Sequence, residues 1–145
     1  MIGLLQRVSE ASVTVNGELV GQIGRGILVL IGVQKGDVAA HAERLAQRLL
    51  TYRVFADTED KMNLSVQDVR GGILLVPQFT LAADTRKGTR ASFTSAAPPA
   101  EGLQLFNHLL NIIESRHQAV ASGRFGADMQ VSLINDGPVT FWLEV

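Results

Sequence analysis

The first chemical signal in this sequence is a group of uncharged polar residues at the end of an apolar run. In "GGILLVPQFTLAADTRKGTRASF", residues 71–93, the segment 73–76 is typical of a strand buried on both faces. It leads directly into Pro77, Gln78 and Thr80. Strand ends are where folds place binding and catalytic groups, because a rigid element there gives way to a loop that can shape a pocket. A plain strand end with a proline stop is the alternative interpretation.

Phe79 lies between Gln78 and Thr80. In an extended backbone its ring would face away from the two polar side chains, so either the polar pair or the ring points into a pocket. Downstream, "RKGTR" at residues 86–90 is the one local basic cluster in a chain with 13 basic and 14 acidic residues. A phosphate of an RNA end can dock on such a cluster, and a solvated loop is the alternative.

A second chemical signal is "NDGPVTFW", residues 135–142. Gly137-Pro138 falls where a strand begins, and an X-Pro bond is the ordinary place for a cis peptide, at about 0.5–1 kcal/mol intrinsically. Trans is the commoner state of such bonds. The local sequence by itself indicates a turn, because Asp-Gly pairs favour reversals between antiparallel strands.

Hydrophobic patterning predicts the strands that position these residues. An Asn16-Gly17 pair marks a hairpin near the start, and an all-apolar run, "GILVLIGV", reads as a central strand. The segments with strand character are residues 2–8, 11–15, 19–23, 26–33, 73–76, 129–134 and 139–145.

Two helices are expected to cover the sheet. Asp37 can cap the first, which should run to about Tyr52, and Pro98-Pro99 opens the second, which Gly123 should stop. Residues 56–65 are polar and rich in turn formers, which predicts a surface loop. The sequence therefore predicts a mixed α/β fold, with antiparallel hairpins at both ends, forming a single domain over residues 1–145.

Composition narrows the chemistry. Cysteine is absent, which excludes disulfides and thiolate nucleophiles and favours a reducing compartment. The three histidines lack i, i+4 partners, and no phosphate-binding loop opens a helix, so we expect neither a metal nor a cofactor. Arg7 and Glu10 fall inside what would have to be the apolar region of a signal peptide, and no later apolar segment is long enough to span a membrane. We therefore expect a cytoplasmic protein without a membrane partner.

Several separated blocks together resemble the D-aminoacyl-tRNA deacylases. These blocks are "QRVSEASVTV" from Gln6, "QFTLAADTRKG" from Gln78 followed by Ser92-Phe93, and "GRFGADMQVSLINDGPVTFW" from Gly123. The resemblance runs nearly end to end. It implies a homodimeric editing enzyme with curved, largely antiparallel or mixed sheets covered by two main helices. Its substrate would be tRNA whose 3′-terminal adenosine carries a D-amino acid or glycine as an ester.

The resemblance also assigns roles to residues. Gly137-Pro138, in the cis form, would reach from one subunit into the active site of its partner and exclude L-amino acids. Arg7 would help to hold the backbone of that dipeptide. A gate made of backbone suits the rejection of L-amino acids, because a backbone cannot rotate away from a colliding L side chain as a side chain can.

The catalytic pocket would be lined by Gln78, Phe79 and Thr80. Phe79 would offer its backbone N–H to the ester carbonyl, Thr80 would offer its hydroxyl, and Met129 would lie near the adenosine. The family usually has Ser where this chain has Pro77, and Pro where it has Ala91. Pro77 removes both a hydroxyl and an N–H, so no role that needs either group can be carried over.

The absence of an obvious triad fits this chemistry, because backbone donors and the 2′-hydroxyl of the ribose can promote hydrolysis of a labile ester. Two alternatives stay open. Thr80 can be a covalent nucleophile in a conventional esterase, although no base lies near it in sequence. The same fold and pocket can also belong to a non-catalytic dimeric binding module.

Overall fold

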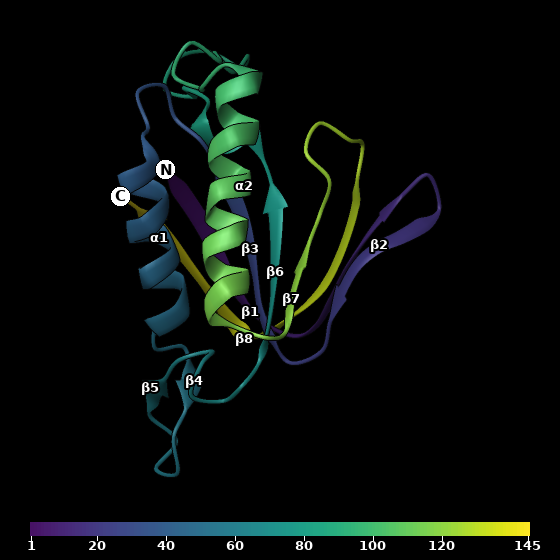
Figure 1. Cartoon of the computed structure of the whole chain (residues 1–145), viewed down its shortest axis with the longest axis vertical. Coiled ribbons are helices and arrows are strands. Elements are labelled where there is room, and N and C mark those ends of the chain that lie inside the picture. The colour runs from purple at the N-terminus through teal and green to yellow at the C-terminus, as the bar shows by residue number, and fades with distance from the viewer.

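A computed structural model describes residues 1–145 and shows one large curved sheet (Figure 1). Its order is β2-β1-β3-β6-β7, and β8 pairs with the other edge of β1. The β3-β6 and β6-β7 pairs are parallel, and the pairs that β1 makes are antiparallel. The strands are β1 (Ile2–Val15), β2 (Glu18–Ile23), β3 (Gly26–Gly32), β6 (Gly72–Pro77), β7 (Val120–Ser122) and β8 (Gln130–Glu144).

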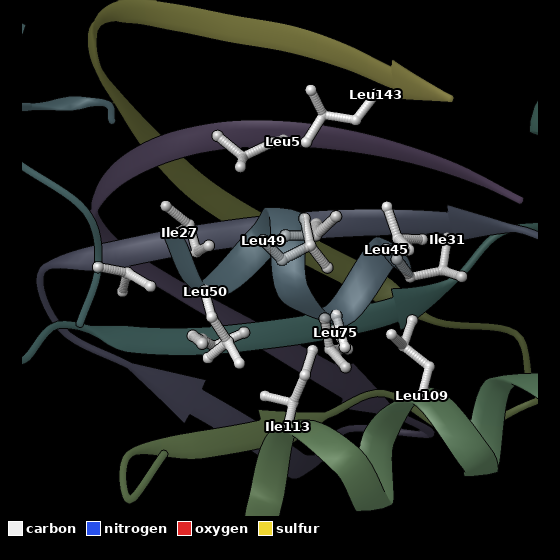
Figure 2. Packing of buried hydrophobic residues seen from close by; sticks show 14 of the residues in the cluster. Leu5, Ile27, Ile31, Leu45, Leu49, Leu50, Leu75, Leu109, Ile113 and Leu143 are labelled. Atoms are coloured by element: carbon white, nitrogen blue, oxygen red, sulfur yellow. The ribbon is translucent and has the colours of Figure 1, made fainter. Parts of the chain in front are cut away.

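Two helices, α1 (Ala39–Thr51) and α2 (Pro99–Arg116), lie side by side over one face of the sheet (Figure 1). Leu45 and Leu49 of α1 and Leu109 and Ile113 of α2 recur at helical spacing, so each helix turns one apolar stripe toward the strands. These side chains meet Leu75 of β6 in the larger of two hydrophobic cores (Figure 2). The expected mixed α/β architecture with two covering helices is confirmed.

The opposite face of the sheet carries the second core, which includes Val8, Leu28, Leu74 and Val76. β2 folds across this face and contacts β6 and β7, so the sheet curls almost into a barrel. Because β3 and β6 are buried on both faces, they need apolar residues throughout, as their sequences have.

The reversal expected at Asp136-Gly137 does not occur. β8 continues from Gln130 to Glu144 along a single strand, β1, which joins the two segments expected at the amino terminus. The register slips where Gln6 pairs with Thr140 but Val8 pairs with Asn135, so the extra residues bulge out opposite Arg7. Pairing with β1 on both sides of the bulge overrides the local turn preference.

Asn135 spans this bulge. Its Oδ1 accepts a hydrogen bond from the Val139 N–H at 2.7 Å, and its Nδ2 donates to Thr140 Oγ1 at 2.8 Å. The side chain thus supplies a partner for the Val139 N–H and ties Asn135 to Thr140 on the other side of the bulge. Gly137 has a φ of +139°, a conformation that favours glycine.

The helix boundaries and the first loop also differ from expectation. Asp37 does not cap α1, because its carboxylate binds the Met1 ammonium at 2.8 Å and the Gln34 N–H at 2.7 Å. α2 ends at Arg116, before Gly123, and the short strand β7 lies between them. Residues 56–65 include most of a small hairpin formed by β4 (Phe55–Ala56) and β5 (Met62–Leu64). No helix is both long and apolar enough to cross a membrane.

Candidate functional site

The polar residues after β6 lie in a tight turn. β6 ends at Pro77, and η1 (Phe79–Ala82) is a 3-10 helix, so the alternation expected of an extended chain does not apply. The turn brings Gln78 and Thr80 together, with Gln78 Nε2 donating a hydrogen bond to Thr80 Oγ1. No histidine, lysine or carboxylate bonds the Thr80 hydroxyl, so the structure gives it no general base.

An apolar cavity of about 270 Å³ opens beside this turn. Its walls come from the ends of β3 and β6, the first turns of α2 and the segment after β7, and they include Ile31, Pro77, Phe79, Gly102, Phe106 and Phe125. Gly102 makes room for an aromatic wall, since a Cβ at that position would lie 3.2 Å from the Phe125 ring. The cavity can take a flat aromatic group such as a nucleobase.

A second hollow of about 260 Å³ shares Pro77, Gln78, Phe79 and Gly126 with the first. Met129 lines this hollow, and its sulfur accepts the Arg124 N–H at 3.3 Å. The structure therefore brings three of the predicted site residues, Gln78, Phe79 and Met129, to one place. Phe79 is 59% exposed, and its ring packs against that of Phe93, with the ring centroids 5.2 Å apart.

Arg7 lies under the Gly137-Pro138 segment. The Gly137-Pro138 peptide is cis, and Arg7 Nε donates to the carbonyl oxygen of Asp136 at 2.9 Å. Its Nη1 donates to the carbonyl of Val54 at 2.7 Å, which anchors the guanidinium to the chain beyond α1. Arg7 thus holds the residue immediately before the dipeptide rather than the dipeptide carbonyls.

Within one chain, the Gly137-Pro138 segment lies far from the pocket. In the register, Arg7 pairs with Ile27, whereas Pro77 pairs with Ile31 at the other end of β3, and β8 lies three strands away from β6. Four residues along the strands and three strand spacings amount to roughly 20 Å. The predicted site residues therefore form two groups within one chain.

The largest pKa shift in the protein lies in the loop that follows η1. Arg86 donates from Nε and Nη2 to both carboxylate oxygens of Asp84, at 2.9 and 2.7 Å. These bonds, with that from the Arg86 N–H, hold the pKa of Asp84 far below its usual range and raise that of Arg86. The carboxylate of Asp84 thus neutralises the charge of Arg86, which belongs to the basic cluster at residues 86–90.

Sequence reasoning missed two residues of the site. Phe125 lines the apolar cavity, and Asn135 fixes the bulge. The quoted blocks "GRFGADMQ" and "NDGP" contained both, and an Asn two residues before a Gly-Pro pair is a signal for side-chain bonding to the backbone.

Comparison with known proteins agrees with the fold and with the family that the sequence motifs resemble. Residues 4–144 match the D-Tyr-tRNA(Tyr) deacylase family. The D-aminoacyl-tRNA deacylase of Thioalkalivibrio sulfidiphilus is 66% identical over the whole chain and 97% of that protein. The D-aminoacyl-tRNA deacylase of Nitrosococcus oceani is 59% identical, over the whole chain and 94% of that protein. The solved c-Myc DNA Unwinding Element Binding Protein superposes with a TM-score of 0.96 at 40% identity, over the whole chain and 99% of the other.

The curled sheet with two helices on one face and a pocket at the end of β6, together with these relatives, identifies the protein as a deacylase, which is a hydrolase. The chain belongs to the D-Tyr-tRNA(Tyr) deacylase family.

Proposed function

We propose that this protein hydrolyses the ester that joins a D-amino acid, or glycine, to the 3′-terminal adenosine of tRNA, and that it rejects L-aminoacyl-tRNA. The family match over residues 4–144 and the names of full-length relatives support the reaction. The local support is a pocket that combines an aromatic, base-sized cavity with a tight turn of backbone and hydroxyl groups. The place of action is the cytoplasm.

In this proposal the turn at η1 stabilises the transition state. The Phe79 N–H donates to the oxyanion that develops on the ester carbonyl, a contribution commonly worth about 3–4 kcal/mol. The 2′-hydroxyl of the terminal ribose assists the attacking water. Thr80 is not the nucleophile in this proposal, because its oxygen already accepts the Gln78 amide hydrogen and no base is bonded to it.

The apolar cavity takes the adenine base, with Phe106 and Phe125 as aromatic walls. The second hollow, which Met129 lines, shares Gln78 and Phe79 with it and so adjoins the same nucleoside. Neither hollow is lined by a lysine, arginine or histidine. Binding of the terminal nucleoside there rests on stacking and burial of apolar surface.

The chiral gate comes from a second copy of the chain. The observation that carries this is the separation of Gly137-Pro138 from the pocket within one chain, roughly 20 Å by strand geometry. β8 pairs only with β1, so the other edge of this 15-residue strand is unpaired, and the exposed side chains of Ile134 and Trp142 belong to it. A symmetric dimer would cover this strand and give each pocket its partner's gate.

The test is the preference for D over L substrate in Arg7→Ala. Loss of the bonds to Asp136 and Val54 frees the segment before Gly137, so kcat/KM for L-aminoacyl-tRNA should rise at least tenfold relative to that for the matched D substrate. The ratio does not depend on the folded fraction. Arg44→Ala, on the exposed face of α1, is the matched control. An unchanged ratio in Arg7→Ala would refute the role of Arg7, and wild-type inactivity on D-aminoacyl-tRNA would refute the function.

A further inference from the structure

We propose that the loop from Asp84 to Ser92, here called the basic loop, is a clamp for the phosphodiester backbone of the single-stranded 3′ end of tRNA. Lys87 and Arg90 are the residues that contact the phosphates. The inference rests on the proposed function and adds to it the part of the site that recognises the nucleotides preceding the terminal adenosine.

The basic loop is anchored beside the pocket residue Phe79. One residue separates Asp84 from the end of η1, and the loop closes where the Asp84 N–H donates to the Ser92 carbonyl at 2.8 Å and the Ser92 N–H donates to the Asp84 carbonyl at 3.0 Å. Just beyond, Phe93 packs on Phe79, and Ser95 Oγ donates to the Ala82 carbonyl at 2.5 Å. Whatever the tip binds is therefore held at a fixed place relative to Phe79.

The tip of the loop presents free positive charge. Arg86 is occupied by its two-pronged contact with Asp84, which leaves Lys87 and Arg90 without any ion pair or side-chain hydrogen bond. Both are exposed. Gly88 turns the chain between them at a φ of +66°, with open space around it. The basic loop, closed by the two hydrogen bonds between Asp84 and Ser92, thus carries two unpaired cations at its tip.

Phosphate is the ligand that fits this charge. The substrate reaches the pocket as the end of a polyanion, yet the chain has a net charge of −1 and no cation lines either hollow. The attraction for the polyanion must therefore come from residues outside the pocket. The basic loop is the basic segment next to the pocket residue Phe79. Lys and Arg on a loop contact the backbone without reading bases, which suits an enzyme acting on a sequence shared by tRNA 3′ ends.

The experiment compares two substrates with Lys87→Ala/Arg90→Ala. One is D-aminoacyl-tRNA, and the other is 3′-D-aminoacyl-adenosine, which has no phosphate. For tRNA, KM should rise about tenfold near 0.15 M salt with kcat unchanged, and the slope of log(kcat/KM) against log[salt] should become shallower by about 1.4. For the adenosine ester, both parameters should stay at wild-type values. The control Arg44→Ala/Lys61→Ala removes two distant charges.

A second variant tests the same assignment in the opposite direction. Asp84→Asn removes a carboxylate and frees Arg86 as a third cation, so KM for tRNA should fall and the salt slope should steepen by about 0.7. Equal losses on both substrates in the double variant, or losses matched by the control, would overturn the clamp. Unchanged tRNA kinetics with an active wild type would overturn it while leaving the proposed reaction intact.

Discussion

At the residue scale, the contact between Gln78 and Thr80 separates two mechanisms. Since Thr80 Oγ1 accepts the amide hydrogen of Gln78 and has no base, it is poorly placed to become an alkoxide. We predict that Thr80→Ala keeps deacylation of D-aminoacyl-tRNA within about tenfold of wild type. Replacing the terminal adenosine by 2′-deoxyadenosine should slow it at least a hundredfold, because the water loses its assisting hydroxyl.

Single-turnover rates on both substrates provide the measurement for this prediction. Thr80→Ser serves as a control that keeps the hydroxyl. If Thr80→Ala abolished turnover while Thr80→Ser and the deoxy substrate retained it, the covalent mechanism would hold instead. An acyl-enzyme trapped on Thr80 by rapid quenching would lead to the same conclusion.

At the element scale, the position of the pocket depends on how closely β3 and β6 approach. Gly26 pairs with Gly72 at the start of both strands, and a Cβ on Gly26 would overlap the backbone of Gly72. We predict that Gly26→Ala lowers the free energy of unfolding by more than about 3 kcal/mol, since backbone on both sides leaves nothing flexible to move. Urea denaturation measures this effect.

Gly24→Ala is the matched control, because an added methyl there meets nothing within 4 Å. Its unfolding free energy should stay within about 0.5 kcal/mol of wild type. Equal stability of the Gly26 and Gly24 variants would show that the two strands can separate without loss, and would contradict the packing described above.

At the scale of the whole molecule, the gate and the pocket become one site only in an assembly. We predict that the active species is a symmetric dimer joined at the unpaired strand β8. Asp substituted for Ile134, which is 54% exposed on this strand, should shift the protein toward monomer and lower deacylation in parallel. Sedimentation velocity combined with activity across protein concentrations measures both.

Asp substituted for Leu19 is the control, since Leu19 is 57% exposed but lies on β2. It should leave sedimentation and activity unchanged. A fully active monomer, with D selectivity retained, would refute both the dimer and the partner's gate.

The sequence by itself determined the elements whose signals are local. The apolar runs of β3 and β6 and the helical spacing in α1 and α2 appear in consecutive residues, and the structure contains all four elements, with α2 ending at Arg116 before the expected stop at Gly123. The resemblance carried by separated motifs also predicted the family, which the match over residues 4–144 confirms. Local patterns suffice for these features because the same residues both form the element and bury its face.

Only the tertiary structure decided the features that depend on distant partners. Asp136-Gly137 is a turn signal, yet β8 continues through it because β1 pairs on both sides and Asn135 bridges the bulge. Asp37 looks like a helix cap, yet the Met1 ammonium takes its carboxylate. The separation of Gly137 from Phe79 is likewise set by sheet order. Contacts between residues far apart in sequence outweigh local propensities of about 1 kcal/mol or less, and no window along the chain contains them.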